Sequence, residues 1–330
     1  MENKKQIGLW KDQNKIFKTD TSNNNIYIEK FIFPCARNCI IQYLKEKNFS
    51  RNNYIVIQEY MGFCVLNSIN KVATTVPFNF INSNNIKHTN TILIYNQWGW
   101  EKSQEKINEL KDKFKNIILD RVDTLIDYTN DKNHYKNVDC EIFSLNKTLG
   151  LGGGGLLWIK DKYIKFLKKK KTTQEQILVD HINDTEYSNY DFIDHLLKNN
   201  FQTYSKKLQV NISTLDINRI VSFEIKCRKM NLDLLIKSFN QYLPDWMLKI
   251  NKDNKTFPGI FPLRLKDKSK YDLIINKMKY EFDIDSTVLN FNFSDNYLDY
   301  CWEKVIPIPL HSDISFEKLK LLINLIKNLI

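Results

Sequence analysis

Residues 143–156 read Phe-Ser-Leu-Asn-Lys-Thr-Leu-Gly-Leu-Gly-Gly-Gly-Gly-Leu and hold five of the nine glycines in a chain of 330 residues. Glycine permits positive φ angles and a close approach of the backbone to a ligand. Apolar residues flank this glycine run at 142–143 and 156–159, which favours a tight crossing between buried strands over a flexible surface turn. No Gly-Lys-Ser/Thr closes the run, so it is not a Walker loop. Lys147 instead precedes the glycines, at a place suited to an amine nucleophile.

The segments before this stretch alternate between strand and helix patterns. Apolar runs predict strands at 54–58, 71–77, 91–95 and 116–120, and helical spacing predicts helices at 38–47, 62–70 and 101–115. This alternation is typical of an α/β fold with three layers, α/β/α, in which helices cover both faces of a mostly parallel sheet. Ligands of such sheets bind beyond the carboxyl ends of the strands, which is where we expect Asp120.

The remaining residues predict a second, smaller unit. After two helices at 163–171 and 191–199, the pattern predicts helices at 222–243, 268–280 and 315–330 and strands at 258–265, 288–293 and 306–310. We therefore divide the chain into a large domain, residues 1–220, which includes an N-terminal segment, and a small C-terminal α/β subdomain, residues 221–330.

Composition narrows the function classes only partly. The formal net charge is +11, but the lysines are dispersed and no aromatic-basic motif for nucleic acid is present. We expect no membrane span and, because the first residues lack the apolar stretch of a secretory signal, a cytoplasmic protein. No two of the six cysteines form a Cys-x-x-Cys pair, and the five histidines are isolated in the sequence, so we expect no metal site.

Lys147 and Asp120 together indicate a particular cofactor chemistry. An aldehyde cofactor can trap a lysine amine as a Schiff base, and Ser144 is near enough in sequence to bond a phosphate group of that cofactor. A pyridoxal phosphate (PLP) enzyme also needs a carboxylate that keeps the pyridine nitrogen protonated. Asp120, at the end of a predicted strand, is the candidate for that carboxylate.

With these residues in view, the chain resembles the DegT/DnrJ/StrS family of PLP-dependent sugar aminotransferases over most of its length. The similar segments are 33–44, 55–64, 118–123, 143–156, 261–268 and 306–315. The resemblance implies the aspartate aminotransferase-like fold type I, with PLP as cofactor and sites shared between the two subunits of a homodimer. Lys147 matches the Schiff-base lysine of the family, and Asp120 matches the carboxylate at the pyridine nitrogen.

The resemblance also implies the other groups that hold the cofactor. Ala36 and Arg37 begin the segment that holds the phosphate, together with Ser144, and Phe63 falls where the family places a ring stacked on the pyridine. Asp123 stands at the position of the usual Gln, and Arg37 replaces a small residue. The resemblance further implies that Lys147 transfers protons, for which its pKa would have to be lowered.

The implied reaction moves an amino group from an amino acid, glutamate in most of the family, to a keto sugar. The resemblance points to a nucleotide-linked sugar used in surface polysaccharide or glycan biosynthesis. Family members that dehydrate sugars carry His at the lysine position, so Lys147 argues against that branch. Two alternatives stay open: a decarboxylase or amino-acid-modifying enzyme on the same scaffold, for which Arg121 and Asp123 near the ring leave room, and an inactive scaffold protein.

Overall fold

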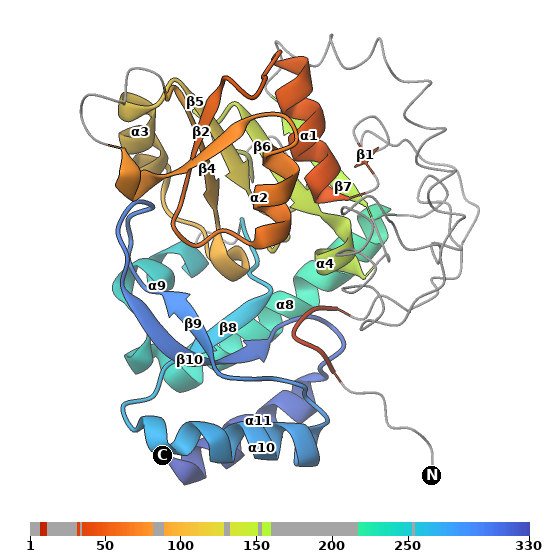
Figure 1. Ribbon diagram of the computed structural model, residues 1–330. Helices are drawn as coiled ribbons and strands as arrows, with labels where there is room; N and C mark the ends of the chain where they lie inside the picture. The colour runs from red at the N-terminus through yellow and green to blue at the C-terminus, as the bar shows by residue number, and fades with distance from the viewer. Residues whose placement is uncertain are drawn as a thin grey trace.

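A computed structural model describes residues 7–11, 32–33, 35–81, 89–128, 133–150, 154–159, 217–252 and 255–330 (Figure 1). The helices predicted at 163–171 and 191–199 lie outside these ranges. None of the helices within the ranges has the length and apolar character needed to cross a lipid bilayer.

The larger sheet has seven strands among the described residues. Their order is β1 (Ile32–Phe33), β7 (Gly155–Ile159), β6 (Cys140–Ser144), β5 (Asn116–Asp120), β4 (Thr91–Tyr95), β2 (Tyr54–Ile57) and β3 (Thr74–Pro77). The strands from β6 to β3 run parallel, whereas β7 returns antiparallel to β6 and β1 is antiparallel to β7. The sheet is therefore mostly parallel, as the alternating pattern predicts.

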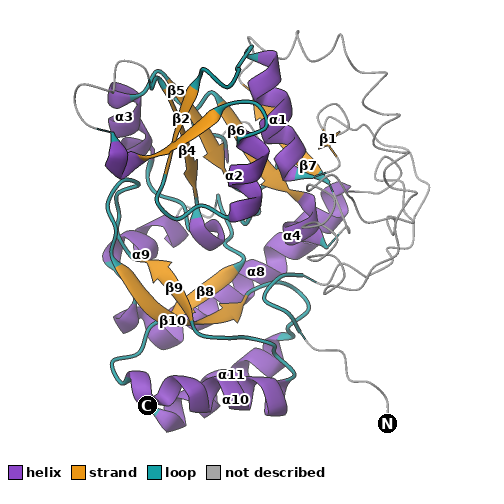
Figure 2. Cartoon of the chain, in the orientation of Figure 1, coloured by secondary structure: helices purple, strands orange, loops and turns teal. Residues whose placement is uncertain are grey.

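Helices cover both faces of this sheet (Figure 2). Alternate residues of a strand point to opposite sides, and apolar residues on each side pack against helices. Ile118 of β5 packs in a cluster with α1 (Ala36–Glu46) and α2 (Phe63–Ile69) on one face. Its neighbours Ile117 and Leu119 pack in another cluster, with α3 (Gln104–Lys113), on the other face. This arrangement confirms the three-layer prediction.

The C-terminal residues form the smaller α/β unit. Three antiparallel strands pair in the order β8 (Ile260–Leu263), β10 (Trp302–Pro309) and β9 (Leu289–Asn292). One apolar cluster joins this sheet to four helices: α8 (Ile217–Phe239), α9 (Asp245–Lys252), α10 (Tyr271–Phe282) and α11 (Phe316–Leu329). Short 3-10 helices lie at Phe78–Phe80, Gln97–Gly99, Asn240–Tyr242 and Lys268–Lys270.

Three details of the small unit differ from the sequence-based expectation. Helix α9 (Asp245–Lys252) is not predicted by the pattern, and β10 begins at Trp302, four residues before the predicted strand at Ile306. Helix α8 begins at Ile217, so the domain boundary that we predict after residue 220 falls within a helix. That division of the chain remains a prediction.

Candidate active site

The carboxyl ends of β4, β5 and β6 carry the candidate catalytic residues. Tyr95 and Asp120 are the last residues of β4 and β5 and pair with each other in the sheet register. Strand β6 leads directly into α4 (Leu145–Leu149), a single helical turn that carries Lys147. The Ser144 hydroxyl caps this turn by accepting a hydrogen bond from the Lys147 backbone N–H at 3.3 Å. Because parallel strands end at the same edge of a sheet, these residues meet there.

A chain of three polar side chains links two of these strands. The Lys147 ammonium donates to Oδ1 of Asp123 at 2.9 Å, and the Tyr95 hydroxyl donates to Oδ2 of the same carboxylate. Asp123 is fully buried, whereas the Lys147 side chain keeps 36% of its surface exposed. The Trp98 backbone N–H donates to the Tyr95 oxygen at 3.3 Å and so helps to fix the phenol ring. Asp123 is thus held on both sides, and it holds the lysine amine in turn.

The pKa of Lys147 is raised above its ordinary value. Burial favours the neutral amine, but the nearby carboxylates of Asp123 and Asp120 favour the ammonium and outweigh it. The lowering that we expect from the sequence depends on a bound cofactor, so it remains a prediction for the loaded protein. The rise in the protein without cofactor comes from Asp123, a charged carboxylate at the position where the family pattern has a neutral Gln.

The pKa of Asp120 is also raised, but at this carboxyl the rise favours the neutral form. Its side chain is 2% exposed, and burial is the main reason why its pKa rises to about 7. The Lys147 ammonium lowers this pKa, while the Asp123 carboxylate raises it further. The Val122 backbone N–H donates to Asp120 Oδ1 at 3.1 Å and fixes the carboxylate at the end of its strand. Asp120 is therefore a buried carboxylate that a neighbouring cation would keep ionised.

The first turn of α1 provides the candidate anion-binding end of the site. Ala36 and Arg37 begin the helix, and its N-cap residue, Cys35, makes no side-chain hydrogen bond to the helix amides. The amides of a first turn attract anions such as phosphate. A Cβ atom on Gly155 would lie 2.4 Å from the Ala36 nitrogen, so β7 passes directly against this helix end.

Arg37 interacts with cysteines at the starts of α1 and α2, and Phe63 is the first residue of α2. The thiols of Cys35 and Cys64 raise the pKa of Arg37 against the opposing effect of burial. Cys64, in the first turn of α2, also helps to raise the pKa of Lys147. Phe63, the first residue of α2, is 63% exposed. Its proposed contact with a cofactor ring remains a prediction.

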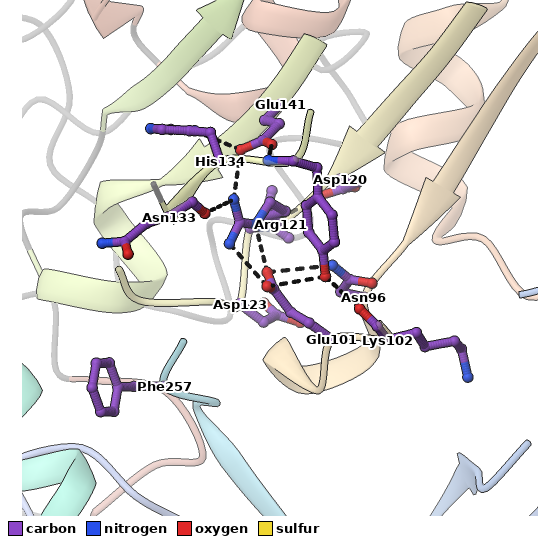
Figure 3. Close-up of polar contacts among 12 residues, drawn as sticks. Asn96, Glu101, Lys102, Asp120, Arg121, Asp123, Asn133, His134, Glu141 and Phe257 are labelled. Atoms are coloured by element: carbon purple, nitrogen blue, oxygen red, sulfur yellow. Dashed lines mark hydrogen bonds and ion pairs between the residues drawn. The ribbon is translucent and has the colours of Figure 1, made fainter. Parts of the chain in front are cut away.

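Arg121 does not line this site. Because it follows Asp120, its side chain points to the other side of the strand, where it is fully buried. There the guanidinium donates to Glu101 at 2.5 and 2.9 Å and to Glu141 at 2.5 Å (Figure 3). The Nδ1 atom of His134 lies 2.7 Å from the same Glu141. The expectation that Arg121 lies near the cofactor ring is therefore wrong.

Three residues of the site escaped the sequence reasoning. Tyr95 was recognisable only through strand register, which pairs it with Asp120. The Trp10 ring centroid lies 4.7 Å from the Lys147 ammonium, although the two residues are far apart in sequence. The buried Arg228 of α8 donates to the backbone oxygen of Thr148 at 3.0 Å and so supports the helical turn that carries Lys147. No local motif marks the last two.

Comparisons with known proteins agree with the fold. A family model described as "Putative PLP-dependent aminotransferase" matches residues 14–329. The structure is similar to a DegT DnrJ EryC1 StrS aminotransferase from Brucella abortus, with 12% identity, a TM-score of 0.56 and coverage of 90% of this chain and 85% of that one.

Two further solved structures show the same fold. The PLP-form of "Putative sugar aminotransferase Spr1654" from Streptococcus pneumoniae has 14% identity, a TM-score of 0.52 and coverage of 91% of this chain and 86% of that one. The aminotransferase TlmJ from Streptoalloteichus hindustanus has 11% identity, the same TM-score and the same two coverages. A search of curated protein sequences gave no match.

Proposed function

Because the chain belongs to the family described as "Putative PLP-dependent aminotransferase", we propose that it moves an amino group from glutamate to a keto sugar. We further propose that the sugar is nucleotide-linked, that the pathway makes a surface polysaccharide or another glycan, and that the protein acts as a cytoplasmic homodimer. The observation that carries the proposal is the Lys147 amine, which lies 2.9 Å from a buried carboxylate at the carboxyl edge of a parallel sheet.

The residues at this edge fit PLP by their chemistry. When bound, PLP withdraws electrons from the α-carbon of an amine substrate and carries the amino group between two substrates. Lys147 would hold the aldehyde carbon and Asp120 the pyridine nitrogen. A buried carboxylate with a pKa of about 7 gains most from a cationic partner, which a protonated pyridine supplies.

The phosphate and the ring would be held by the remaining candidates. The first-turn amides of α1 would attract the phosphate group of the cofactor. Ala36, Arg37 and Ser144 are the candidates that would hold it there. Phe63 is exposed at the start of α2, and it would cover the ring. Asp123 would contact the cofactor on the side where Lys147 lies.

Asp123 also controls the proton on Lys147. As an ammonium, Lys147 can neither attack a carbonyl carbon nor accept a proton. When the amine has lost its proton, it can take one from the α-carbon of the amino donor and return it elsewhere on the substrate. Tyr95 fixes the second oxygen of Asp123, so the carboxylate stays directed at the amine during this transfer.

A small pocket beside Tyr95 lies between the large sheet and β9 and β10 of the small unit, and its cavity of about 30 Å³ has room for about two water molecules. The side-chain amides of Gln58, Gln97 and Asn292 in its lining are already hydrogen-bonded to backbone groups, and Lys102 donates to the Ser294 oxygen. The choice of a sugar as acceptor therefore rests on the resemblance to sugar aminotransferases and not on this pocket.

The near-ultraviolet and visible absorbance of the purified protein tests the cofactor and the donor together. We expect a yellow band with PLP that changes to the form of the aminated cofactor when glutamate is added. Lys147→Ala should lose the lysine-bound band. The matched control is Lys106→Ala, which removes a surface lysine paired with Glu109 at 2.9 Å and should retain the band.

The outcomes separate the alternatives. A band that does not respond to glutamate contradicts the choice of donor, and release of CO2 from an added amino acid supports the decarboxylase alternative. Failure to bind PLP supports the inactive scaffold. Acceptors are then tested as a panel of nucleotide-linked keto hexoses, and conversion of 2-oxo acids alone would contradict the sugar proposal.

A further inference from the structure

The N-terminal strap, which we define as residues 7–11, crosses the small unit before it reaches the candidate site (Figure 1). Ile7 forms a parallel bridge with Ile284. Its backbone N–H donates to the Asp283 oxygen at 2.6 Å, and its own oxygen accepts from the Asp285 N–H at 2.9 Å. The start of the strap is therefore fixed by backbone hydrogen bonds.

The rest of the strap is fixed by buried polar contacts. His311 accepts a hydrogen bond at Nδ1 from the Asp313 backbone, so Nε2 carries its proton and donates to the Gly8 oxygen at 3.0 Å. Lys11, only 3% exposed, forms a buried ion pair with Glu224 of α8 and also donates to the Ser312 hydroxyl at 2.7 Å. The residues on both sides of Trp10 are thus clamped to the small unit.

Trp10 is also confined by its surroundings. Its ring lies so close to Gly259 that a Cβ atom there would approach the Trp10 Cζ3 atom to 3.1 Å. The Lys147 ammonium lies 4.7 Å from the centre of the ring, within the range of a cation–π contact. Since the strap cannot slide along the small unit without breaking its clamps, the ring stays beside the amine.

From this geometry we infer that Trp10 is a specificity-determining residue, whose indole forms one wall of the active site against which the amino acceptor packs. The inference rests on the proposed function, because it requires a carbonyl compound to react beside Lys147. Any such compound must share the space around the amine with the indole.

The chemistry of this wall indicates the kind of acceptor that fits. An indole face is flat, apolar and electron-rich, so it favours a partner with C–H groups or positive charge directed at it. A sugar ring presents a C–H face of this kind. The wall thus favours an acceptor whose ring can pack its C–H groups against the indole.

The test fixes a fluorescent group at the amine. Wild-type protein and Trp10→Phe are loaded with PLP and reduced with borohydride, which leaves a pyridoxyl group on the lysine, and peptide mass locates that group. Indole quenches fluorophores that it touches, so we expect Trp10→Phe to lose most of the quenching and to show a longer pyridoxyl lifetime. The matched control is Trp158→Phe, which should keep the wild-type lifetime. Trp158 lies in β7, directly opposite Glu141 of β6 in the strand register.

Kinetics supply the second measurement. With a keto hexose accepted by the wild type, Trp10→Ala should raise the acceptor KM about tenfold, equivalent to about 1.4 kcal/mol, with little change in kcat. Trp10→Phe should recover most of this loss because it retains an aromatic face.

The results test the role of Trp10 separately from the proposed function. Pyridoxyl at Lys147 with the same lifetime in wild type and Trp10→Phe would overturn the wall inference and leave the proposed function intact. Absence of pyridoxyl from Lys147 in the wild type would overturn the proposed function and, with it, the inference about Trp10.

Discussion

Substitution of Asp120 by Asn should stabilise the cofactor-free protein increasingly as the pH rises. Burial raises the pKa of this carboxyl to about 7 from an ordinary value of 3.8. The folded state therefore binds the proton more tightly than the unfolded state does. Between these two pH values the wild type loses stability with rising pH, because the folded protein must either retain a proton or bury a charge. Asn carries no charge at any of these pH values, so the variant avoids the loss.

The size of the effect follows from the difference between the two pKa values. At 1.36 kcal/mol per unit, a rise from 3.8 to about 7 corresponds to about 4 kcal/mol once the pH exceeds the folded-state pKa. About 2 kcal/mol of this is already present at about pH 5, and the rest develops by about pH 8. The free energy of unfolding of Asp120→Asn relative to wild type should therefore grow by roughly 2–3 kcal/mol over this interval.

Urea denaturation of the two cofactor-free proteins at both pH values measures this change. The Asn amide introduces a donor that the Asp120 carboxylate lacks, and any cost of burying this donor is the same at every pH. The change with pH is therefore the diagnostic quantity. Asp112→Asn, an exposed site on α3, serves as the control and should show almost no pH-dependent difference from wild type.

A constant difference between Asp120→Asn and wild type across the interval would refute the reasoning. It would mean that the carboxyl titrates near its ordinary value, and thus that its burial is compensated. A difference that shrinks with rising pH would reverse the sign of the argument, because it would show that the ionised carboxylate stabilises the fold.

Three further substitutions test other contacts of the site. Asp123→Asn should lower the pKa of Lys147, because the ammonium loses its partner at 2.9 Å; pH-dependent amine labelling of cofactor-free protein measures this, and an unchanged midpoint would contradict it. Arg121→Met should lower the free energy of unfolding by about 3–5 kcal/mol, since two buried glutamates lose their cation; a loss below about 1 kcal/mol in urea would show that they are neutral. Gly155→Ala should destabilise the fold by about 1–3 kcal/mol and weaken PLP binding, because its Cβ would meet the Ala36 nitrogen; wild-type affinity in a PLP titration would show that the helix end is not used.

The meeting of Lys147 and Asp120 at one edge of the sheet was predictable because its signals are local. Lys147 stands between a strand pattern and a rare run of glycines, and Asp120 ends an apolar strand. Parallel strands of similar length bring such ends together without further information. The same logic, applied to register, would have added Tyr95, whose strand ends opposite Asp120.

The rest of the site depends on contacts that no local pattern contains. Trp10 reaches the amine only because the strap binds across the small unit, whose contacts are separated from it by most of the chain. Arg121 was misplaced because the choice of strand face depends on buried partners at Glu101 and Glu141. Helix α9 was missed for a similar reason, since its eight residues are stabilised mainly by packing.

Because β7 returns antiparallel beside β6, the position of Lys147 does not depend on how many residues the glycine run contains. Ser144 pairs with Gly155 at the base of this loop, and the Leu145 N–H donates to the Gly154 oxygen at 3.0 Å. The lysine lies within a closed hairpin whose two ends are tied to each other. Insertions or deletions at its tip therefore leave the base unchanged, so the hairpin can vary in length without moving the lysine.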